Sequence, residues 1–379
     1  MEIVEIMESN VKPNNLVSEF WTEEKFKHSQ DEWTELLKKT NADPLFLSWS
    51  WLHAWWSVCS KPSDELFIIA IYERNELIAI APLYKENDSY FNGILRTRRL
   101  QFIGKRFSGG KGVRSEYMDI IVQTDRQELG IIEVLSIIGA DTRWSELLLS
   151  DFNTSSLNYS YIKTWLNKQK MHGRIESQGH AFIVDCSATF DEYVKNLGKN
   201  TRLKLYNRRK LLETKGSVEI EYINSGNKEA LFALMNDLHA QRWGGVFLNK
   251  LNKHFFNLAT GFCSEKLSLK YSCVLKLDGK PISVMINIDC NDRIYNIQTG
   301  YIEGFDKRIA LGTLHIGYVL EKAFNEPSIK IFDFLEGKGK NSDYKSRIAV
   351  EGDFLESSRW LRSTLLKFIF RFYDKYIRR

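Results

Sequence analysis

The chain has 379 residues, 43% of them hydrophobic and 13% aromatic, which is enough for two domains with packed cores. Its formal charge of +5 is too small to indicate a nucleic-acid partner, and its five cysteines form no pattern typical of zinc or a disulfide framework. The acidic first ten residues and the lack of about eighteen consecutive apolar residues predict a cytoplasmic protein without a signal peptide or membrane span.

The first part of the chain is rich in aromatic side chains. Residues 1–43 read as a leader and one short helix, and residues 44–59 as a second helix with Trp49, Leu52 and Trp56 on one face. Such a face is typical of a buried core helix. Residues 66–85 predict a hairpin that turns at residues 73–76.

A glycine-containing basic loop follows at residues 105–120. Its three glycines near lysine and arginine predict either a cradle for a phosphate or sugar group or a mobile surface loop. Arg114, Glu116 and Tyr117 stand at the start of the strand that leaves this loop. Beyond it, the pattern predicts a helix at residues 127–138 and a strand at residues 144–149.

Helices dominate the middle of the chain. Residues 187–212 read as one strongly basic helical stretch, which is either a solvated face or a clamp for an anionic ligand. The clear helix at residues 228–242 ends in front of Gly244 and Gly245, so its last side chains face a loop. His239 is therefore a candidate base, although a histidine near a helix end also simply favours the helix dipole. Arg242 and Trp243 lie beside it in the sequence.

The segment at residues 294–349 organises the second half. A hairpin at residues 271–289 leads into a strand (293–301), a helix (313–324) and a second strand (328–335). Two strands that bracket one helix predict a βαβ crossover and hence a parallel pair, with a ligand beyond the carboxyl ends of the strands. The helix start at Gly312 and Thr313, with Lys307 and Arg308 upstream, suits a diphosphate, or it is only a turn.

The last residues carry an excess of positive charge. Residues 359–379 hold seven basic side chains and one acidic side chain, and the basic residues follow a stripe of an expected amphipathic helix. This helix is expected either to pack on the body or on a second copy, or to lie on an anionic membrane as a peripheral contact.

Several motifs resemble one known family. They are FDFLEG (332–337), DYKSRI (343–348), Leu238-His239, Arg242-Trp243 and RSEYMDIIV (114–122). The chain resembles the cellulose-biosynthesis-type (CelD-like) acetyltransferases, a branch of the GNAT superfamily, over roughly residues 45–350. The segment 308–313 is poorer in glycine than the usual phosphate loop of that superfamily. The resemblance implies acyl transfer from an acyl-CoA, acetyl-CoA above all, without a metal.

The resemblance also implies a set of site residues. Acyl transfer from a thioester needs a polarised donor carbonyl, a base for the acceptor and an acid for the leaving thiolate. The candidate catalytic residues are Asp333, Glu336 and His239 as bases, with a structural role for Asp333 as the alternative. Tyr344 is a candidate acid or a group that orients the acceptor. The expected acyl-CoA contacts are Gln298, Thr299, Gly300, Arg308, Leu311, Gly312 and Thr313. The expected substrate contacts are Arg114, Glu116, Tyr117, Arg242, Trp243, Lys345 and Arg347.

These observations predict an α/β (α+β) fold of two tandem GNAT-like domains, each a mixed, mostly antiparallel sheet flanked by helices, the first degenerate. The expected parts are residues 1–43, 44–186, 187–358 and 359–379. The predicted function is acyl-CoA-dependent N- or O-acyl transfer to an amino sugar, nucleotide sugar or polysaccharide precursor, with oligomers allowed and no nucleic acid expected. The alternatives are a Fem-like aminoacyl-tRNA-dependent transferase, whose extended coiled-coil arm is missing here, and a non-catalytic component of a polysaccharide assembly system.

Overall fold

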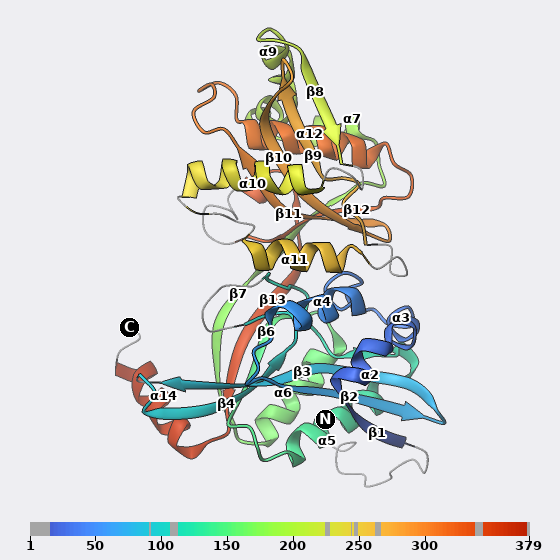
Figure 1. The fold of residues 1–379 in the computed structure, drawn as a ribbon, viewed down its shortest axis with the longest axis vertical. Coiled ribbons are helices and arrows are strands. Elements are labelled where there is room, and N and C mark those ends of the chain that lie inside the picture. The colour runs from blue at the N-terminus through green and yellow to red at the C-terminus, as the bar shows by residue number, and fades with distance from the viewer. Residues whose placement is uncertain are drawn as a thin grey trace. The chain divides into compact units, whose positions relative to one another are not determined.

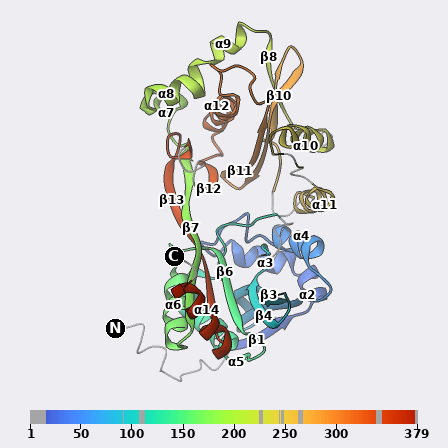
Figure 2. The same cartoon turned by 90° about the vertical axis from the view of Figure 1, so that its left-hand side faces the viewer.

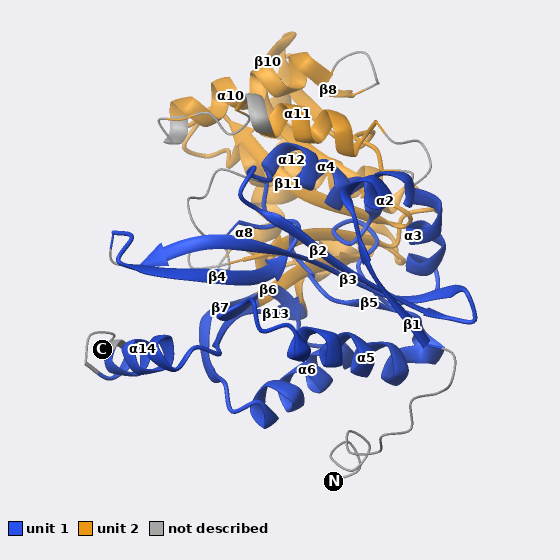
Figure 3. Ribbon diagram, turned by 60° about the horizontal axis from the view of Figure 1, so that its bottom comes forward, with its two compact units in different colours: residues 1–179, 353–379 blue, residues 180–352 orange. Residues whose placement is uncertain are grey.

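The chain folds into two compact units (Figure 3). The computed structural model describes residues 16–90, 92–106, 113–223, 228–243, 245, 249–261, 267–337 and 344–376. Unit 1 consists of the residues up to Gly179 together with those from Asp353 onward, and unit 2 is His180–Gly352. Strands β7 (His172–Asp185) and β13 (Val350–Leu361) each have residues in both units.

Unit 1 is built on a mixed sheet in the order β1-β2-β3-β4-β6-β13. Its own strands are β1 (Leu16–Trp21), β2 (Glu65–Glu73), β3 (Glu76–Tyr90), β4 (Leu95–Phe102), β5 (Ile121–Val122) and β6 (Glu146–Asn153). All neighbours on this path run antiparallel except β4 and β6, which are parallel. The predicted hairpin at residues 66–85 is confirmed as β2 and β3.

Helices cover both faces of this sheet (Figure 3). On one face lie α2 (Glu23–His28), α3 (Gln30–Leu37) and α4 (Trp49–Cys59), and on the other α5 (Gln127–Ala140) and α6 (Leu157–Lys168). The short 3₁₀ turn η1 (Thr124–Arg126) precedes α5. The aromatic helix α4 is buried, with Trp51 and Trp55 fully enclosed, so its prediction as a core helix is confirmed.

Unit 2 repeats this plan. Its sheet follows the order β7-β12-β11-β10-β9-β8, with β8 (Val218–Tyr222), β9 (Cys273–Leu277), β10 (Lys280–Cys290), β11 (Arg293–Tyr301) and β12 (Ile331–Glu336). The strands are antiparallel except for β11 and β12, which confirms the predicted parallel pair. Each unit therefore contains four antiparallel strands, a helix, and a fifth strand parallel to the fourth.

The helices of unit 2 lie on two faces of its sheet (Figures 1 and 2). On one face α12 (Leu311–Phe324) packs with α7 (Phe190–Asn196), α8 (Lys199–Arg202), the π-helical turn η2 (Leu203–Asn207) and α9 (Arg209–Glu213). On the other lie α10 (Lys228–Trp243) and α11 (Lys250–Ala259). The core around α12 includes Leu205, Val319, Leu320 and Phe332. The predicted fold of two tandem domains with mixed, mostly antiparallel sheets is confirmed.

Three expected segments differ from the structure. In place of a leader and one short helix over residues 1–43, residues 16–21 form β1, and the two helices α2 and α3 follow. The stretch at residues 187–212 is not one helix, because a capping box at Thr189 starts α7 and Gly198 begins a new helical segment. The expected helix from residue 359 begins later, at Thr364, because Arg359–Leu361 form the end of β13. Within the described ranges, none of the helices combines the length and apolar character needed to span a bilayer.

Candidate functional site

The parallel strands of unit 2 part after a short shared segment. β11 and β12 pair only from Arg293 opposite Ile331 to Tyr295 opposite Asp333. Beyond these three pairs β11 continues to Tyr301 and β12 to Glu336. These two strand ends no longer pair with each other, and we call them the unit 2 fork. It lies at the carboxyl ends of the strands, where open α/β sheets bind ligands.

A β-bulge shapes the β11 side of the fork. The register with β10 shifts so that Ile297 is an extra residue between Asn296 and Gln298. Two buried amides hold this point, because Asn296 Nδ2 donates to Asn287 Oδ1 at 2.8 Å and Asn287 Nδ2 donates to the Tyr271 carbonyl at 2.8 Å. The bulge is therefore held by side-chain hydrogen bonds in addition to the strand ladder.

A second bulge shapes the β12 side. Phe334 and Leu335 are unpaired between Asp333 and Glu336, and Leu335 has a φ of 62°, a conformation that β-strand leucines rarely adopt. Asp333 Oδ1 accepts the Leu335 N–H at 2.6 Å, and Asp333 Oδ2 lies 3.1 Å from an Arg293 guanidinium nitrogen. The Lys345 ammonium donates to the carbonyls of Phe334, Leu335 and Glu336.

These contacts give Asp333 and Lys345 positioning roles. Asp333 is fully buried and holds both a strained backbone N–H and the Arg293 charge. The buried Lys345 ammonium is directed at the backbone of β12. Asp333 was predicted as a base, with a structural role as the alternative, and Lys345 as a substrate contact. The contacts described above for both side chains are made with Arg293 and the backbone of β12. Arg293, which the sequence analysis missed, is the cation that a buried carboxylate requires.

The start of α12 has no capping side chain. Its N-cap residue is Ala310, which has no side chain to accept the first N–H groups, and Leu314 is the first residue whose N–H finds a helical acceptor, the Ala310 carbonyl. The N–H groups of Leu311, Gly312 and Thr313 therefore have no intrahelical partner. Gly312 lies against the Tyr301 ring, where a Cβ would come within 2.7 Å of Cε1.

Arg308 lies just before this helix and is exposed. It donates to both carboxylate oxygens of Asp306, which also contacts Lys215 Nζ at 2.8 Å. The hydrogen bonds from Arg308 and Lys215 hold the pKa of Asp306 well below its usual range. The group of three carries a net positive charge beside the helix start, which favours an anionic ligand.

A buried hydrogen-bond chain fastens α12 to the sheet. The Ser283 hydroxyl donates to the Gly300 carbonyl at 3.0 Å, so His315 Nδ1, 2.9 Å from Ser283 Oγ, must donate to it. His315 Nε2 then accepts from the Cys273 thiol, whose sulfur lies 3.2 Å away. Burial lowers the pKa of His315 to about 3, so the ring is neutral at ordinary pH. These hydrogen bonds join α12 to β9, β10 and β11, and they were not predicted from the sequence.

α10 crosses β11 on the opposite face. A Cβ on Gly300 would come within 3.2 Å of Met235 Sδ and 3.3 Å of Leu238 Cβ, so the helix rests on the fork strand there. The next residue, His239, is half-buried, and its Nδ1 donates to the Gly245 carbonyl at 2.7 Å. A neutral His239 therefore keeps its lone pair on Nε2. The side chains of Arg242 and Trp243 lie outside the described residues.

The remaining expected residues of unit 2 lie at or near the fork. Gln298 and Thr299 follow the β11 bulge and are half-buried. Glu336 is buried at the end of β12, directly after the strained Leu335. Tyr344 packs against the core and Arg347 is exposed. Of the basic stretch, Arg209 pairs with Glu321 and lies over the Tyr318 ring, so it holds α9 against α12.

Unit 1 contains a corresponding fork between β4 and β6, and the chain itself fills it. These strands also share three parallel pairs, and β6 has a matching bulge at Asp151, with φ 46°. Ser115 Oγ donates to the Gly104 carbonyl just beyond β4, at 2.7 Å. Met118 pairs with Phe152 in β6, with its N–H on the Asp151 carbonyl at 2.9 Å. The buried residues 115–118 thus occupy the unit 1 fork.

The three expected substrate residues of unit 1 belong to this filling segment. Tyr117 is buried and stacks on Phe46, with ring centroids 6.2 Å apart. Arg114 contacts Asp151 at 2.7 Å and Glu116 at 3.4 Å. These three residues stabilise the segment against β6. Residues 107–112 of the glycine-containing loop lie outside the described residues.

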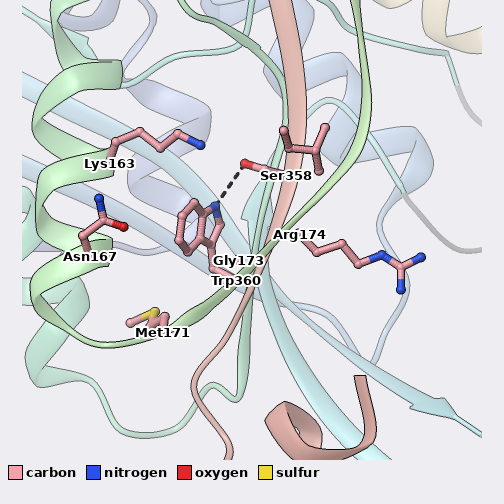
Figure 4. A pocket seen from close by; sticks show the side chains of 8 residues that line it. Lys163, Asn167, Met171, Gly173, Arg174, Ser358 and Trp360 are labelled. Atoms are coloured by element: carbon pink, nitrogen blue, oxygen red, sulfur yellow. Dashed lines mark hydrogen bonds between the residues drawn. The ribbon is translucent and has the colours of Figure 1, made fainter. Parts of the chain in front are cut away.

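A pocket of about 330 Å³ lies elsewhere in unit 1, between α6 and the strands β7 and β13 (Figure 4). Trp360 forms its floor, lies on Gly173 and donates from Nε1 to Ser358 Oγ at 3.0 Å. Lys163 extends above this ring and pairs with Glu356 at 3.0 Å. The pocket contains none of the expected site residues. Among the described residues, no group of three or more histidine, cysteine or acidic side chains is placed to hold a metal ion.

Comparison with known proteins agrees with this geometry. Residues 199–346 match the model of the acetyltransferase (GNAT) domain family. The match includes the unit 2 fork, the start of α12, Glu336 and His239. The matched residues all lie in unit 2, so unit 2 is the part of the chain that is similar to an acetyltransferase (GNAT) domain. A search of curated proteins finds no match.

Solved structures show the same fold at low sequence identity. A crystal structure of FemX aligns over 93% of this chain and 99% of its own, with 10% identity and a TM-score of 0.59. A conserved protein of unknown function from Bacteroides thetaiotaomicron aligns over 91% and 99%, with 11% identity and a TM-score of 0.52. A tandem GNAT protein from the clavulanic acid biosynthesis pathway aligns over 92% and 99%, with 10% identity and a TM-score of 0.49. The FemX alignment covers both units, so it shows a shared fold over nearly the whole chain.

Proposed function

We propose that unit 2 transfers an acyl group from acyl-CoA to an amine or hydroxyl of an amino sugar, nucleotide sugar or polysaccharide precursor. The observation that carries the proposal is the unit 2 fork beside the open start of α12, inside the matched GNAT domain. An extended pantetheine needs two strand edges that separate, and a diphosphate needs helix N–H groups without other acceptors. Both lie at the carboxyl end of β11.

In the proposed reaction, the N–H groups of Leu311, Gly312 and Thr313 bind the diphosphate, and the β11 backbone at Gln298 and Thr299 polarises the thioester carbonyl. Glu336 or His239 Nε2 takes the proton of the acceptor as its nitrogen or oxygen attacks the carbonyl carbon. The carbon–sulfur bond then breaks, and Tyr344 donates a proton to the leaving thiolate. No covalent enzyme intermediate is required.

The two bulges support this assignment of roles. The side chains of Asn296 and Asn287 hold the β-bulge of β11. The bulge of β12 is held by Asp333, Arg293 and Lys345. Preorganised backbone groups lower the cost of stabilising the developing oxyanion. We therefore propose Glu336 as the base ahead of Asp333, since Asp333 would have to give up Arg293 and the Leu335 N–H to act on a substrate.

The acceptor class rests on the CelD-like sequence resemblance, and the proposal puts the enzyme in the cytoplasm, where acyl-CoA is available. An aminoacyl-tRNA donor is the competing proposal, and a non-catalytic role is the third. The likeness to FemX bears on the fold and not on the donor. In the described residues the longest helix is α10, with 16 residues, so they hold no extended helical arm.

Calorimetric titration of the full chain with acetyl-CoA tests the proposal first. We expect saturable binding of one molecule per chain, because the unit 1 fork is filled. Mass spectrometry of acyl-CoAs incubated with amino-sugar nucleotides then identifies the acceptor. No binding of any acyl-CoA would overturn the proposal, and transfer that RNase abolishes would favour the aminoacyl-tRNA donor instead.

A further inference from the structure

The C-terminal helix α14 (Thr364–Tyr376) is fastened to unit 1 by one side. Leu366 is only 2% exposed, and the Phe370 ring meets Tyr90 edge-on with centroids 5.3 Å apart. Asp374 lies 3.1 Å from an Arg174 guanidinium nitrogen. Apolar, aromatic and ionic contacts along three turns thus fix which side of the helix faces outward.

The outward side is apolar. Leu365, Phe368 and Phe372 are 56%, 71% and 55% exposed. Their spacing of three and four residues places them in one stripe along the helix. A contiguous row of two phenylalanines and a leucine is costly to leave in water, whereas isolated exposed apolar side chains are ordinary.

Positive charge runs beside this stripe. Arg371 and Lys375 are exposed, and each lies within one turn of Phe372 or Phe368. Lys367 lies further round, with its Nζ donating to the Lys170 carbonyl at 3.1 Å. The one acidic residue of α14, Asp374, is on the fastened side with Arg174. The outward surface of the helix therefore carries cations and aromatic rings without a carboxylate of its own.

We propose that α14 is a membrane-surface helix that docks unit 1 on a bilayer containing anionic lipid. Phe368, Phe372 and Leu365 would enter the interface, and Arg371 and Lys375 would meet lipid phosphates. This combination of an apolar stripe flanked by basic residues is the pattern of helices that lie in the plane of a membrane surface. An anionic bilayer matches the charge, and its depth accommodates the rings without a preformed groove. The inference does not depend on the proposed function.

Co-sedimentation of the full chain with vesicles tests this surface. We expect binding to phosphatidylcholine vesicles that contain phosphatidylglycerol, and little binding to phosphatidylcholine alone. Arg371→Gln with Lys375→Gln should weaken binding roughly 10- to 30-fold, since each basic residue near an anionic surface changes partitioning about fivefold. Phe368→Ser with Phe372→Ser should reduce it at least as far.

A matched control comes from β1, where Val17 and Phe20 are 56% and 57% exposed. The Val17→Ser, Phe20→Ser double variant removes similar exposed apolar area from another element and should bind vesicles like the wild type. Circular dichroism spectra and melting curves check that each variant is folded. Equal sedimentation of the wild type with neutral and anionic vesicles, or unchanged sedimentation of both α14 variants, would overturn the proposal. It would also be overturned if the stripe variants convert a dimer to a monomer while vesicle binding persists, because the stripe would then be an interface between copies.

Discussion

Placing a carboxylate at residue 313 should weaken acyl-CoA binding without harming the fold. Thr313 is the third residue of α12, is half-buried, and follows an N-cap residue that has no capping side chain. A glutamate at this position improves the helix, because negative charge near the amino end is worth about 0.3–1 kcal/mol. The same charge repels a diphosphate that uses the neighbouring N–H groups. Thr313→Glu should therefore stabilise the fold while it weakens the binding of acetyl-CoA, so the two effects can be told apart.

The expected loss follows from Coulomb's law. Two unit charges roughly 6 Å apart repel by about 0.7 kcal/mol in water and by about 3 kcal/mol at the effective dielectric constant near 20 typical of a protein surface. We therefore expect Thr313→Glu to raise the Kd for acetyl-CoA by roughly three- to a hundredfold. Thr313→Gln is the matched control, since it has nearly the same shape and no charge, and its Kd should stay close to that of the wild type.

Calorimetry measures Kd for the two variants and the wild type, and thermal melting measures their stability. Raising the salt concentration should narrow the difference between the variants, because screening acts on an exposed charge pair. If Thr313→Glu melts at or above the wild-type temperature and binds acetyl-CoA as tightly as Thr313→Gln does, the diphosphate does not rest at the start of α12. The assignment of the fork would then have to be abandoned.

Four further variants test the site and the contacts that hold it in place. Glu336→Gln should lower kcat about a hundredfold with little change in the Kd for acetyl-CoA. Asp333→Asn should instead lower the unfolding free energy by about 3–5 kcal/mol, because Arg293 loses its buried partner. Melting curves and kcat values for both variants test this, and a loss of kcat in a stable Asp333→Asn with normal turnover in Glu336→Gln would contradict it. In the folded chain the pKa of His315 is about 3, below its ordinary value of 6.5. Between these two pH values the unfolded chain binds more protons than the folded chain. The unfolding free energy therefore falls as the pH drops, by up to about 1.4 kcal/mol per pH unit. Urea titrations of His315→Gln should show that slope reduced, and an unchanged slope would count against a neutral His315. A Cβ at Gly317 would lie 2.1 Å from the Leu205 carbonyl oxygen, so Gly317→Ala should destabilise unit 2 by about 1–3 kcal/mol. Gly198→Ala is the control, since a Cβ at residue 198 would point into open space and should not destabilise the protein in this way. Equal melting temperatures of the two variants would refute the close contact at Gly317.

Sequence periodicity predicted the parts of the fold that local patterns govern. The β11–α12–β12 unit follows from two β-branched segments around one apolar helix, and the structure has the expected parallel pair. The strand β13 was missed because its buried residues include Glu356 and Arg359. These charges are buried with partners, Lys163 for Glu356 and Glu146 and Glu176 for Arg359, that are far away in the sequence. A pattern of alternating apolar residues is not visible in such a strand.

The contacts that shape the unit 2 fork were also beyond local patterns. Asp333 and Arg293 are 40 positions apart in number, and only the register of β11 on β12 brings them together. His315 was not predicted as a buried residue. The helix α12 is buried on several sides, since the sheet covers one face and α7 and η2 cover another, so this polar side chain is also enclosed. The sequence did contain one signal for the contact between Asp333 and Arg293, because a carboxylate inside an apolar strand needs a nearby cation.

The two forks show how one backbone plan serves two purposes. In each unit the fifth strand leaves its parallel neighbour at a bulge whose second residue has a positive φ, Asp151 in unit 1 and Leu335 in unit 2. Asp151 offers a carboxylate, which holds Arg114 and Lys105 and so keeps the segment 115–118 in the fork. Leu335 offers no charge, and the Lys345 ammonium takes the carbonyls around it instead. The same position of the two bulges therefore holds different partners. In unit 1 its carboxylate binds the cations beside the segment that fills the fork, and in unit 2 the surrounding carbonyls bind a lysine.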